Sequence, residues 1–475
     1  MNAPTPLAHV TPEIKPRPAP PSLMAALKER FGARFSEAMA VREQHGRDES
    51  AFTTVPPPAG VVFAESTADV QDAVKLCAQH KVPVIPYGVG SSLEGHLLAV
   101  QGGISLDVSR MNRVLSVNAE DLTVTVQPGV TRKQLNDEIK STGLFFPIDP
   151  GADASLGGMA ATRASGTNAV RYGTMRENVL ALEVVTASGE VIRTGTRARK
   201  SSAGYDLTRL FVGSEGTLGV ITEVTLRIYP LPEAVSAAIC SFPTIADAVN
   251  TVIQTVQLGV PIARVELIDA HSVRAVNAHS KLTLREEPLL LMEFHGSPAS
   301  VKEQAETVQD ISRDHHGDDF EWADTPEERT RLWTARHNAY FAAVQSRPGC
   351  RCITTDTCVP ISRLADALLD SVQEAEESGI PYFLVGHVGD GNFHVGYLID
   401  PDDADERARA EALNHRLVTR ALALGGTCTG EHGIGLHKMD FLLHEAGAGA
   451  VAMMRTIKQA LDPDNIMNPG KVFAV

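Results

Sequence analysis

Three stretches of small residues between residues 86 and 221 restrict the fold of this chain more than any other feature. PYGVGSSLEG, at 86–95, follows an apolar segment that is typical of a strand. The segment 149–178 is dense in Gly, Ala, Ser and Asn, and VGSEGTLGVITEV, at 212–224, places glycines at the start of a strand. Glycine removes side-chain bulk and permits positive φ, so the backbone of such loops can approach another group closely.

No single stretch matches a known nucleotide motif. The first is not the dinucleotide fingerprint GxGxxG, because its third glycine is at 95 and no acidic residue with the usual spacing is evident. It is not a P-loop either, because no Lys-Ser/Thr follows, and an ordinary Gly-rich turn explains it equally well. Three such loops in one region nevertheless predict a long cofactor lying across it, and a flavin dinucleotide has that size and shape.

Composition excludes several classes of protein. A chain of 475 residues is expected to form two or three domains, and its net charge of −15 argues against a nucleic-acid-binding surface. No apolar run is long enough to cross a bilayer, and residues 1–20 lack the basic start and apolar stretch of a signal peptide. Six cysteines are few for this length and fit a reducing compartment. We therefore expect a cytoplasmic protein, peripheral at the inner face of a membrane if a partner places it there.

The residue pattern divides the chain into four parts. Residues 1–22 are a Pro-rich lead-in that we expect to be disordered. Residues 23–233 contain a β-α-β pattern over 54–110 and the three small-residue loops. Residues 234–455 mix strands with amphipathic helices, as in α+β domains, and 456–475 form a C-terminal segment.

The stretch GHVGDGNFH, at 386–394, places two histidines around an Asp-Gly turn. Asp-Gly between apolar runs is a strong signal for a two-residue hairpin, which predicts that His387 lies directly opposite His394. Opposite Cβ atoms are about 4.5–5.5 Å apart on one face of a sheet, so both imidazoles could bind one metal ion. Packing or hydrogen bonding within a half-buried sheet is the alternative, and the hairpin alone does not decide between the two.

Eight short motifs, taken in order, make the chain similar to a flavoprotein family. The three small-residue loops resemble the FAD domain of the vanillyl-alcohol oxidase/p-cresol methylhydroxylase (PCMH-type) fold. A closer resemblance covers most of residues 55–473 and is to the D-lactate dehydrogenase (cytochrome) branch, to which glycolate oxidase and D-2-hydroxyglutarate dehydrogenase are related. The motifs are DPGADASLGGMAAT, ASGTNAVRYGTMR, LFVGSEGTLG, LWTARHNA, CVPIS, VGHVGDGNFH, GTCTGEHGIG and LDPDNIMNPGKV.

The resemblance implies an α+β protein. It implies a two-lobed PCMH-type FAD-binding domain over 23–233, an α+β substrate- and metal-binding domain with an antiparallel sheet over 234–455, and a segment at 456–475 that returns to the FAD domain. Because His96 lies beyond the position where covalently flavinylated relatives carry their histidine, we expect FAD to be bound non-covalently. The implied FAD-binding residues are Pro86, Tyr87, Gly88, Val89, Gly90, Ser91, Ser92, Pro150, Gly151, Ser155, Gly158, Met159, Ser165, Gly166, Asn168, Tyr172, Gly173, Glu215, Gly216, Gly219, Ile221 and Asn468.

The resemblance also suggests the chemistry at the histidine hairpin. Glu431, an acidic residue between glycines in a loop that we expect to be free to reach the hairpin, is the candidate third ligand beside His387 and His394; a solvated loop acid is the ordinary alternative. Such a site suits zinc, manganese or iron, of which we expect zinc or manganese. By resemblance His432 is the general base and Arg336 pairs with the substrate carboxylate, whereas a structural imidazole and a surface arginine are the alternatives.

These residues predict the oxidation of a D-2-hydroxy acid, with D-lactate to pyruvate as the best match to the branch. Hydride would pass from C2 to flavin N5, and the electrons to a cytochrome, a quinone or another carrier, because no second redox centre is recognisable in the chain. A glycolate oxidase flavoprotein subunit and a D-2-hydroxyglutarate dehydrogenase are alternatives within the family. A metal-dependent hydrolase is the alternative from another class. The expected partners are a small 2-hydroxy acid, an electron acceptor and a second copy of the chain in a homodimer.

Overall fold

The computed structural model describes residues 16–50 and 55–474, and within it the chain forms two compact units. The first unit comprises the described residues of Met1–Ser165, Thr174–Pro230 and Glu431–Val475. The second comprises Gly166–Gly173 and Leu231–Gly430. Each unit therefore contains pieces of chain that are far apart in the sequence.

The first unit contains a four-stranded sheet in the order β1-β2-β4-β3. Strands β2 and β3 both pair with β4 in parallel, and helix α3 connects them, which confirms the predicted β-α-β unit. Helix α3 begins after Ser66 because this hydroxyl accepts a hydrogen bond from the Asp69 amide. The elements of this part are α1 (Pro21–Phe31), β1 (Phe35–Ser36), α2 (Met39–His45), β2 (Gly60–Phe63), α3 (Thr67–Gln79), β3 (Val84–Tyr87) and β4 (Ile104–Asp107).

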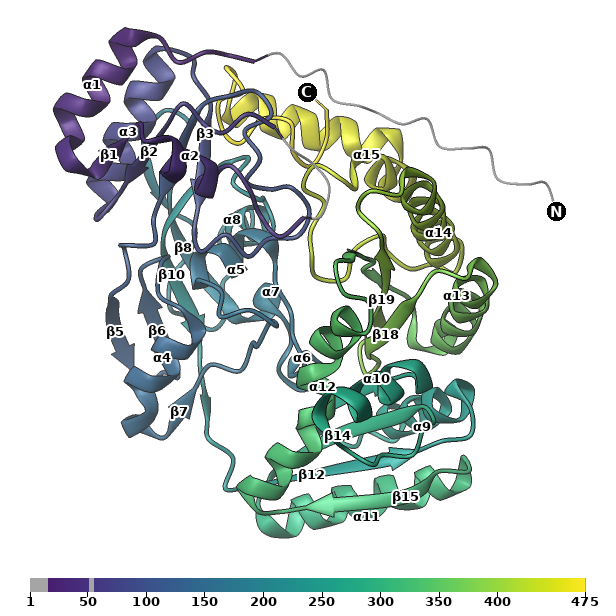
Figure 1. Ribbon diagram of the computed structural model, residues 1–475. Helices are drawn as coiled ribbons and strands as arrows, with labels where there is room; N and C mark the ends of the chain where they lie inside the picture. Colours follow the sequence, from purple (N-terminus) through teal and green to yellow (C-terminus); the bar gives the residue numbers. More distant parts are fainter. Residues whose placement is uncertain (1–15, 51–54, 475) are drawn as a thin grey trace. The chain divides into compact units, whose positions relative to one another are not determined.

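A second sheet of the first unit is antiparallel, in the order β5-β6-β10-β8-β9. Successive residues of β8 face opposite sides. Val184 packs in one apolar cluster with Met159 of α5, and Val185 packs in another with Val74 of α3. This sheet therefore separates two cores, and Figure 1 shows β8 and β10 between α3 and α5.

The remaining elements of the first unit are short apart from the last helix. Met467, after that helix, forms a parallel bridge with Val84, and the Lys458 ammonium donates to the carbonyl of Thr217. The elements are β5 (Val114–Asn118), β6 (Thr123–Val126), α4 (Arg132–Ile139), β7 (Leu144–Phe145), α5 (Leu156–Thr162), α7 (Met175–Asn178), β8 (Val179–Thr186), β9 (Val191–Arg193), α8 (Leu207–Phe211), β10 (Gly219–Arg227), β11 (Tyr229–Pro230) and α15 (Met439–Leu461).

The described part of the Pro-rich lead-in, residues 16–22, is held in place. The Arg17 amide donates to Gln101 O at 2.8 Å, and its guanidinium donates to Asp464 O at 3.0 Å. Pro21 opens helix α1, a position that suits proline because the first amides of a helix have no partner within it. The expected disorder thus does not apply to residues 16–22, and residues 1–15 lie outside the described residues.

The second unit is built on one large sheet in the order β15-β12-β14-β13-β18-β19-β16, with β17 pairing beside β19. All of its pairings are antiparallel, which confirms the expected α+β domain with an antiparallel sheet. The strands are β12 (Ala234–Ser241), β13 (Ile262–Ile268), β14 (Leu289–Gly296), β15 (Asp318–Ala323), β16 (Arg351–Thr354), β17 (Thr357–Cys358), β18 (Tyr382–His387) and β19 (Asn392–Ile399).

Helices pack on the sheet of the second unit in two groups. Helices α10 and α12 pack together against β12 to β14 and β18, whereas α9 and α11 pack together against β12 to β14, and α13 and α14 follow α9 (Figure 1). Ile239 and Leu291 face α10 and α12, in one apolar cluster with Val273 and Ala339. The helices are α6 (Ala169–Tyr172), α9 (Ile245–Gln257), α10 (Ala270–Ser280), α11 (Pro298–Asp314), α12 (Pro326–Ser346), α13 (Leu364–Ser378) and α14 (Ala404–Ala423).

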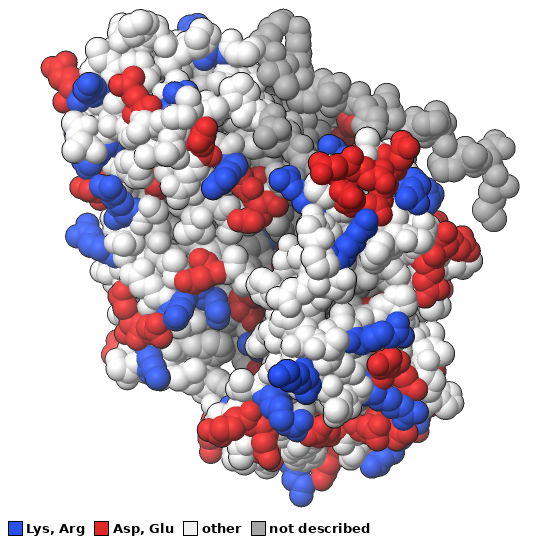
Figure 2. Space-filling view, viewed as in Figure 1, with Lys and Arg blue, Asp and Glu red and all other residues white. Residues whose placement is uncertain are grey.

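Charged side chains of both signs are interspersed on the face of the molecule that Figure 2 shows. Some form pairs between neighbouring helices, as Arg416 of α14 and Glu374 of α13 do at 3.0 Å. Exposed pairs of this kind contribute little to stability. Among the helices of the described residues, none combines the length and the apolar character that a membrane span needs.

Candidate functional site

The first and third small-residue loops and the start of the second come together in the first unit. A Cβ added to Gly88, after β3, would lie 2.5 Å from the Ser155 hydroxyl oxygen, and one added to Gly216 would lie 3.0 Å from the ring of Pro86. Gly216 has φ +74°, which a larger side chain would adopt only with strain. The absence of side chains at these two glycines is therefore what allows the loops to come together.

The Ser155 hydroxyl has the features expected of a cofactor contact. Ser155 is 1% exposed, and among the described residues none makes a hydrogen bond to its Oγ. Buried hydroxyls are nearly always hydrogen-bonded, so an atom of this kind calls for a partner that the chain does not supply. A pyrophosphate or ribose of FAD would provide acceptors there, and the glycines at 88 and 158 leave room around the oxygen. The loops thus fit the cofactor that their composition predicts.

Glu215 joins the third loop to the C-terminal part of the same unit. Its carboxylate accepts hydrogen bonds from the amides of Ile434 and Gly435, both at 2.7 Å, and lies 3.1 Å from His96 Nε2. Burial raises the pKa of Glu215, but the neighbouring His96 charge and these donors outweigh it, so the pKa is lowered. The Asn468 amide donates to the carbonyl of Glu215 at 2.8 Å. Both predicted residues therefore hold chain segments together, and any contact they make with FAD remains a prediction.

The other predicted FAD-binding residues lie in different surroundings. Gly219 is within β10, where a Cβ would approach Val184 of β8 to 2.7 Å, and Ile221 and Met159 are core residues. Asn168 and Tyr172 belong to the second unit, together with Gly166 and Gly173. There Asn168 accepts from Arg264 Nε at 3.0 Å, and the Tyr172 hydroxyl lies 2.9 Å from His295 Nδ1. The predicted FAD set is therefore divided between the units.

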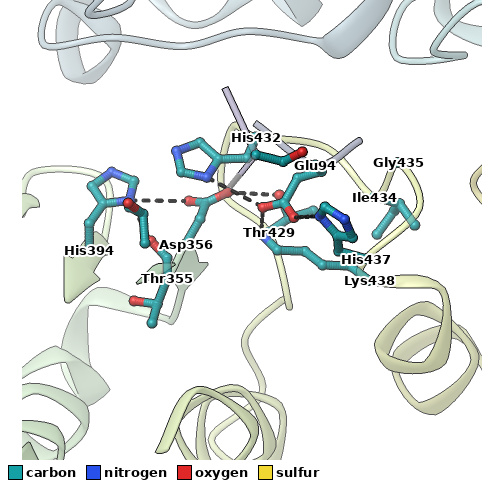
Figure 3. A network of polar contacts seen from close by, with 12 residues as sticks. Glu94, Thr355, Asp356, His394, Thr429, His432, Ile434, Gly435, His437 and Lys438 are labelled. Carbon is teal, nitrogen blue, oxygen red and sulfur yellow. Dashed lines mark hydrogen bonds and ion pairs between the residues drawn. The ribbon is translucent and has the colours of Figure 1, made fainter. Parts of the chain in front are cut away.

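The segment after Glu431 makes several contacts within the first unit. Its Leu436 amide donates to the carbonyl of Glu94 at 2.7 Å, and the Glu94 carboxylate lies 3.0 Å from Lys438 Nζ (Figure 3). His432 Nδ1 is 3.5 Å from the same carboxylate. Burial raises the pKa of Glu94, but Lys438 and the two nearby histidines, His432 and His437, lower it more. Buried Glu94 thus holds the residues that follow Glu431, and the reach of Glu431 to the hairpin stays a prediction.

The histidine hairpin forms, but its predicted register is wrong. His387 pairs with Asn392, and His394 pairs with Val385, so the two histidines are diagonal rather than opposite neighbours. The turn spans four residues, and the Val359 amide donates to the carbonyl of Gly391 at 3.0 Å, which binds the turn to a distant segment. The shift equals two residues, so both rings stay on one face of the sheet, where their centroids are 5.5 Å apart.

Hydrogen bonds fix the protonation of both imidazoles in a form that suits a metal ion. His394 Nδ1 lies 3.0 Å from the carbonyl oxygen of Thr355, which can only accept, so Nδ1 carries the hydrogen (Figure 3). His387 Nδ1 lies 2.7 Å from a Glu266 carboxylate oxygen and donates in the same way. In a neutral imidazole the Nε2 atom then carries the lone pair that binds metals.

The third predicted ligand, Glu431, belongs to the first unit, whereas His387 and His394 belong to the second. Two imidazoles and one carboxylate are a common donor set for catalytic zinc and also suit manganese. The two histidines therefore supply two nitrogen donors on one face of the second unit's sheet, and Glu431 as the third ligand stays a prediction.

Arg336 lies on α12 beside this face of the sheet. Its Nε donates to Glu266 Oε2 at 2.8 Å, and its side chain is 19% exposed. Arginine has five N–H donors in a planar fork, so a bond through Nε leaves the two outer nitrogens for another acceptor. The residue is thus a held guanidinium rather than the mobile surface arginine of the alternative interpretation.

Three acidic residues around the site were not predicted from the sequence. Glu266 touches both His387 and Arg336, Asp356 accepts from Thr429 and Asn392 at 2.7 and 2.8 Å, and Glu94 lies beside His432. Glu266 and Asp356 are fully buried. Glu266 could have been identified from the sequence, because it is an acidic residue within the apolar strand 262–268 and a buried carboxylate requires partners.

Comparisons with known proteins identify the family of the chain. The FAD binding domain family matches residues 58–195, and the family of FAD linked oxidases, C-terminal domain, matches residues 231–472. The chain is 52% identical to the probable mitochondrial D-lactate dehydrogenase of Danio rerio, covering 92% of this chain and 88% of the relative. It is 46% identical to the mitochondrial D-lactate dehydrogenase (cytochrome) of Arabidopsis thaliana, covering 96% and 80%.

A solved structure of p-cresol methylhydroxylase with bound substrate shares the fold, with a TM-score of 0.80 and 18% identity over 95% of this chain and 96% of that one. The names of both sequence relatives place them in mitochondria, so the expectation of a cytoplasmic location is wrong. That expectation relied on composition, which does not distinguish one reducing compartment from another. The chain belongs to the FAD-linked oxidase family with the PCMH-type fold, in the D-lactate dehydrogenase (cytochrome) branch.

Proposed function

We propose that this protein oxidises D-lactate to pyruvate and passes the electrons to a cytochrome. The names and identities of the two sequence relatives support the substrate and the acceptor. The single structural observation that supports the chemistry is the pair of Nδ1-protonated histidines, His387 and His394, whose rings share one face of the sheet. A metal-dependent hydrolase would leave the FAD-binding domain without a role.

The chain's own residues would bind and orient the hydroxy acid. The outer nitrogens of Arg336 form a fork that matches a carboxylate, while its Nε is held by Glu266. This contact would fix the position and the plane of the substrate carboxylate, to which C2 is attached. FAD, bound non-covalently in the loops of the first unit, supplies the acceptor for the hydride that leaves C2.

His432 would take the hydroxyl proton. Its Nδ1 lies 3.5 Å from the Glu94 carboxylate, so a proton gained at Nε2 gives an imidazolium beside a negative charge. His387, His394 and Glu431 would hold a divalent ion, zinc or manganese, which would supply Lewis acidity to the substrate hydroxyl. Oxidation then balances: C2 loses a hydride, the oxygen loses a proton to His432, and pyruvate results.

The test is an anaerobic titration of the FAD-loaded protein with D-lactate, following the flavin's visible absorbance. We expect bleaching by D-lactate, much weaker bleaching by L-lactate and glycolate, and loss of the response after treatment with a chelator. Equal or faster bleaching by glycolate or D-2-hydroxyglutarate would reject D-lactate as the substrate. A response unchanged by chelation, once metal analysis shows the ion has gone, would reject the metal's role.

A further inference from the structure

Glu266 occupies a position that links two functional side chains of the second unit. It lies on β13 and is 0% exposed. One carboxylate oxygen accepts from His387 Nδ1 at 2.7 Å, and the other accepts from Arg336 Nε at 2.8 Å. One carboxylate therefore contacts both a predicted metal ligand and the predicted anchor of the substrate.

The sheet register places Glu266 at this point. Leu267 pairs with Gly386, and Ile268 pairs with Val385. In this antiparallel pair Glu266, the residue before Leu267, lies beside His387 on β18. Alternate residues of a strand face the same side, and Ile268 belongs to the apolar cluster that includes α12 residues. Glu266 therefore faces α12, from which Arg336 reaches it. The contact follows from the register of two central strands and not from a mobile loop.

The contacts of Glu266 fix which partner atoms carry hydrogens. Arg336 Nε always carries a hydrogen and donates to one carboxylate oxygen at 2.8 Å, and the other oxygen lies 2.7 Å from His387 Nδ1. With both oxygens acting as acceptors, each partner must present an N–H to it. His387 is then protonated at Nδ1 and carries its lone pair at Nε2. Arg336 is held through Nε, which sets the plane of its outer nitrogens.

We propose that Glu266 is a positioning residue that orients the metal ligand His387 and the carboxylate-binding Arg336 together. This inference rests on the proposed function for the identity of the substrate. The effect of Glu266 on metal binding does not depend on the identity of the substrate, because its contact with His387 would prepare that ring for a cation whichever hydroxy acid is bound.

The variant Glu266→Gln separates this role from simple packing, because glutamine offers one oxygen and one NH2 to two donors. If the oxygen faces Arg336, the NH2 faces His387 Nδ1, and the ring must move its proton to Nε2, the atom that binds the metal. If the NH2 faces Arg336 instead, two donors oppose each other and the guanidinium turns away. Either arrangement loses one of the two functions.

Glu293→Gln is the matched control. Glu293 is also a buried glutamate on the same sheet, and it pairs with His295 Nε2 at 2.7 Å and with Arg264 at 3.5 Å. Its histidine also contacts Tyr172, through Nδ1, and belongs to no candidate metal group of the described residues. The control therefore reports the general cost of losing a buried glutamate in this sheet. The Glu293→Gln control is therefore used for the measurements of metal affinity and stability, and not for those of turnover.

The primary measurement is the Kd for Zn2+ of the FAD-loaded full chain, determined by competition with a chromophoric chelator. For Glu266→Gln we expect the Kd to rise about 10- to 100-fold, and for Glu293→Gln to stay within twofold of wild type. At saturating Zn2+, the remaining defect of Glu266→Gln should be a raised KM for D-lactate with a smaller fall in kcat.

Several outcomes would overturn the proposal. One is a Zn2+ Kd and a KM for Glu266→Gln that both stay within twofold of wild type, and another is an equal loss of Zn2+ affinity in Glu293→Gln. If Glu266→Gln does not fold, Glu266→Asp carries the test by the same criteria, because it keeps the charge but shortens the reach. A wild-type protein that binds Zn2+ but does not oxidise D-lactate would reject the proposed function alone, and the Zn2+ Kd of the variants would still decide the role of Glu266.

Discussion

Two buried glutamates, one in each unit, have their negative charges balanced by different kinds of hydrogen-bond donor. Glu215 of the first unit accepts from two backbone amides, those of Ile434 and Gly435, with His96 as its charged neighbour. Glu266 of the second unit accepts from two side chains, His387 and Arg336. Both have lowered pKa values despite burial.

The difference lies in what each carboxylate holds. Backbone amides cannot move away when their acceptor is lost, so Glu215 fastens the segment that begins at Glu431 to a loop that precedes it by more than two hundred residues. The partners of Glu266 are side chains whose outer atoms point to other groups. A buried carboxylate can thus secure the fold in one place and orient functional groups in another, and stability measurements should separate the two.

The largest loss of stability is expected for Glu215→Ala. It leaves two buried amides without an acceptor and removes the carboxylate that pairs with His96, so the free energy of unfolding should fall by about 3–5 kcal/mol. Urea denaturation at pH 7, with FAD in equal excess throughout, measures it. Glu120→Ala, at an exposed position, is the control. A loss below 1 kcal/mol would show that the amides find other partners.

Glu266→Ala should cost less stability than Glu215→Ala while impairing function more. The Arg336 side chain is 19% exposed and can turn toward water, and the neutral His387 ring loses one hydrogen-bond acceptor, so we expect a loss of about 1–3 kcal/mol. The same denaturation series measures it, with D-lactate turnover assayed alongside. A loss equal to that of Glu215→Ala would remove the distinction between the two carboxylates.

Lys471 of the first unit differs from both glutamates, because it is a buried charged group whose hydrogen-bond acceptors are neutral. Its ammonium donates to the carbonyl of Leu98 at 2.7 Å, and burial lowers its pKa to about 7. Between that pH and its unfolded pKa near 10.4, the unfolded chain binds more protons, so stability rises with pH. Lys471→Met should lack this rise. We expect the difference in unfolding free energy, wild type minus variant, to grow by up to about 1 kcal/mol per pH unit from pH 7.5 to 9.5.

A flat difference across that range would mean that Lys471 keeps its charge in the folded protein. Because the lysine and the methionine side chains are of similar length, the two proteins can be compared by thermal unfolding in the same buffers. The sign is opposite to that of an ordinary buried ion pair of lysine, whose stabilisation would be lost as the pH rises.

The smallest effect on stability is expected for Ser155→Ala. Its hydroxyl has no partner among the described residues, so removing it from the FAD-free protein should change the unfolding free energy by less than about 0.5 kcal/mol. The Kd for FAD should nevertheless rise about 10-fold, the equivalent of one hydrogen bond. Fluorescence titration of the FAD-free protein measures it, and an unchanged Kd would show that the hydroxyl does not face the cofactor.

Features set by neighbouring residues could be predicted from the sequence. The β-α-β unit and the existence of the histidine hairpin follow from apolar periodicity and turn residues. The hairpin register could not be predicted, because the contact between Val359 and Gly391 that shapes the turn comes from another segment. The two histidines still share a face, since an error of two residues preserves the alternation of a strand.

The acidic partners of the site show the limit of local patterns. Glu94 and Glu266 are separated from His432 and His387 by more than one hundred residues, and only the sheet registers and loop contacts bring them together. The resemblance to known flavoproteins identified residues with expected roles, but it did not indicate what holds those residues in place. For Glu215 and Asn468 the structure adds a mutual contact that the motifs alone do not reveal.

The discontinuity of the first unit has a consequence during synthesis on the ribosome. Its loop at 86–92 emerges early, whereas Asn468, whose amide contacts Glu215, emerges after the whole second unit. At about 5–20 residues per second, the delay is roughly 20–75 s. For that time the nascent FAD domain has its β3 edge and its glycine loops exposed, so chaperones have an interval in which to act. Cofactor capture should therefore be one of the last events in maturation, and a ribosome-stalled chain that lacks the final segment should retain no flavin.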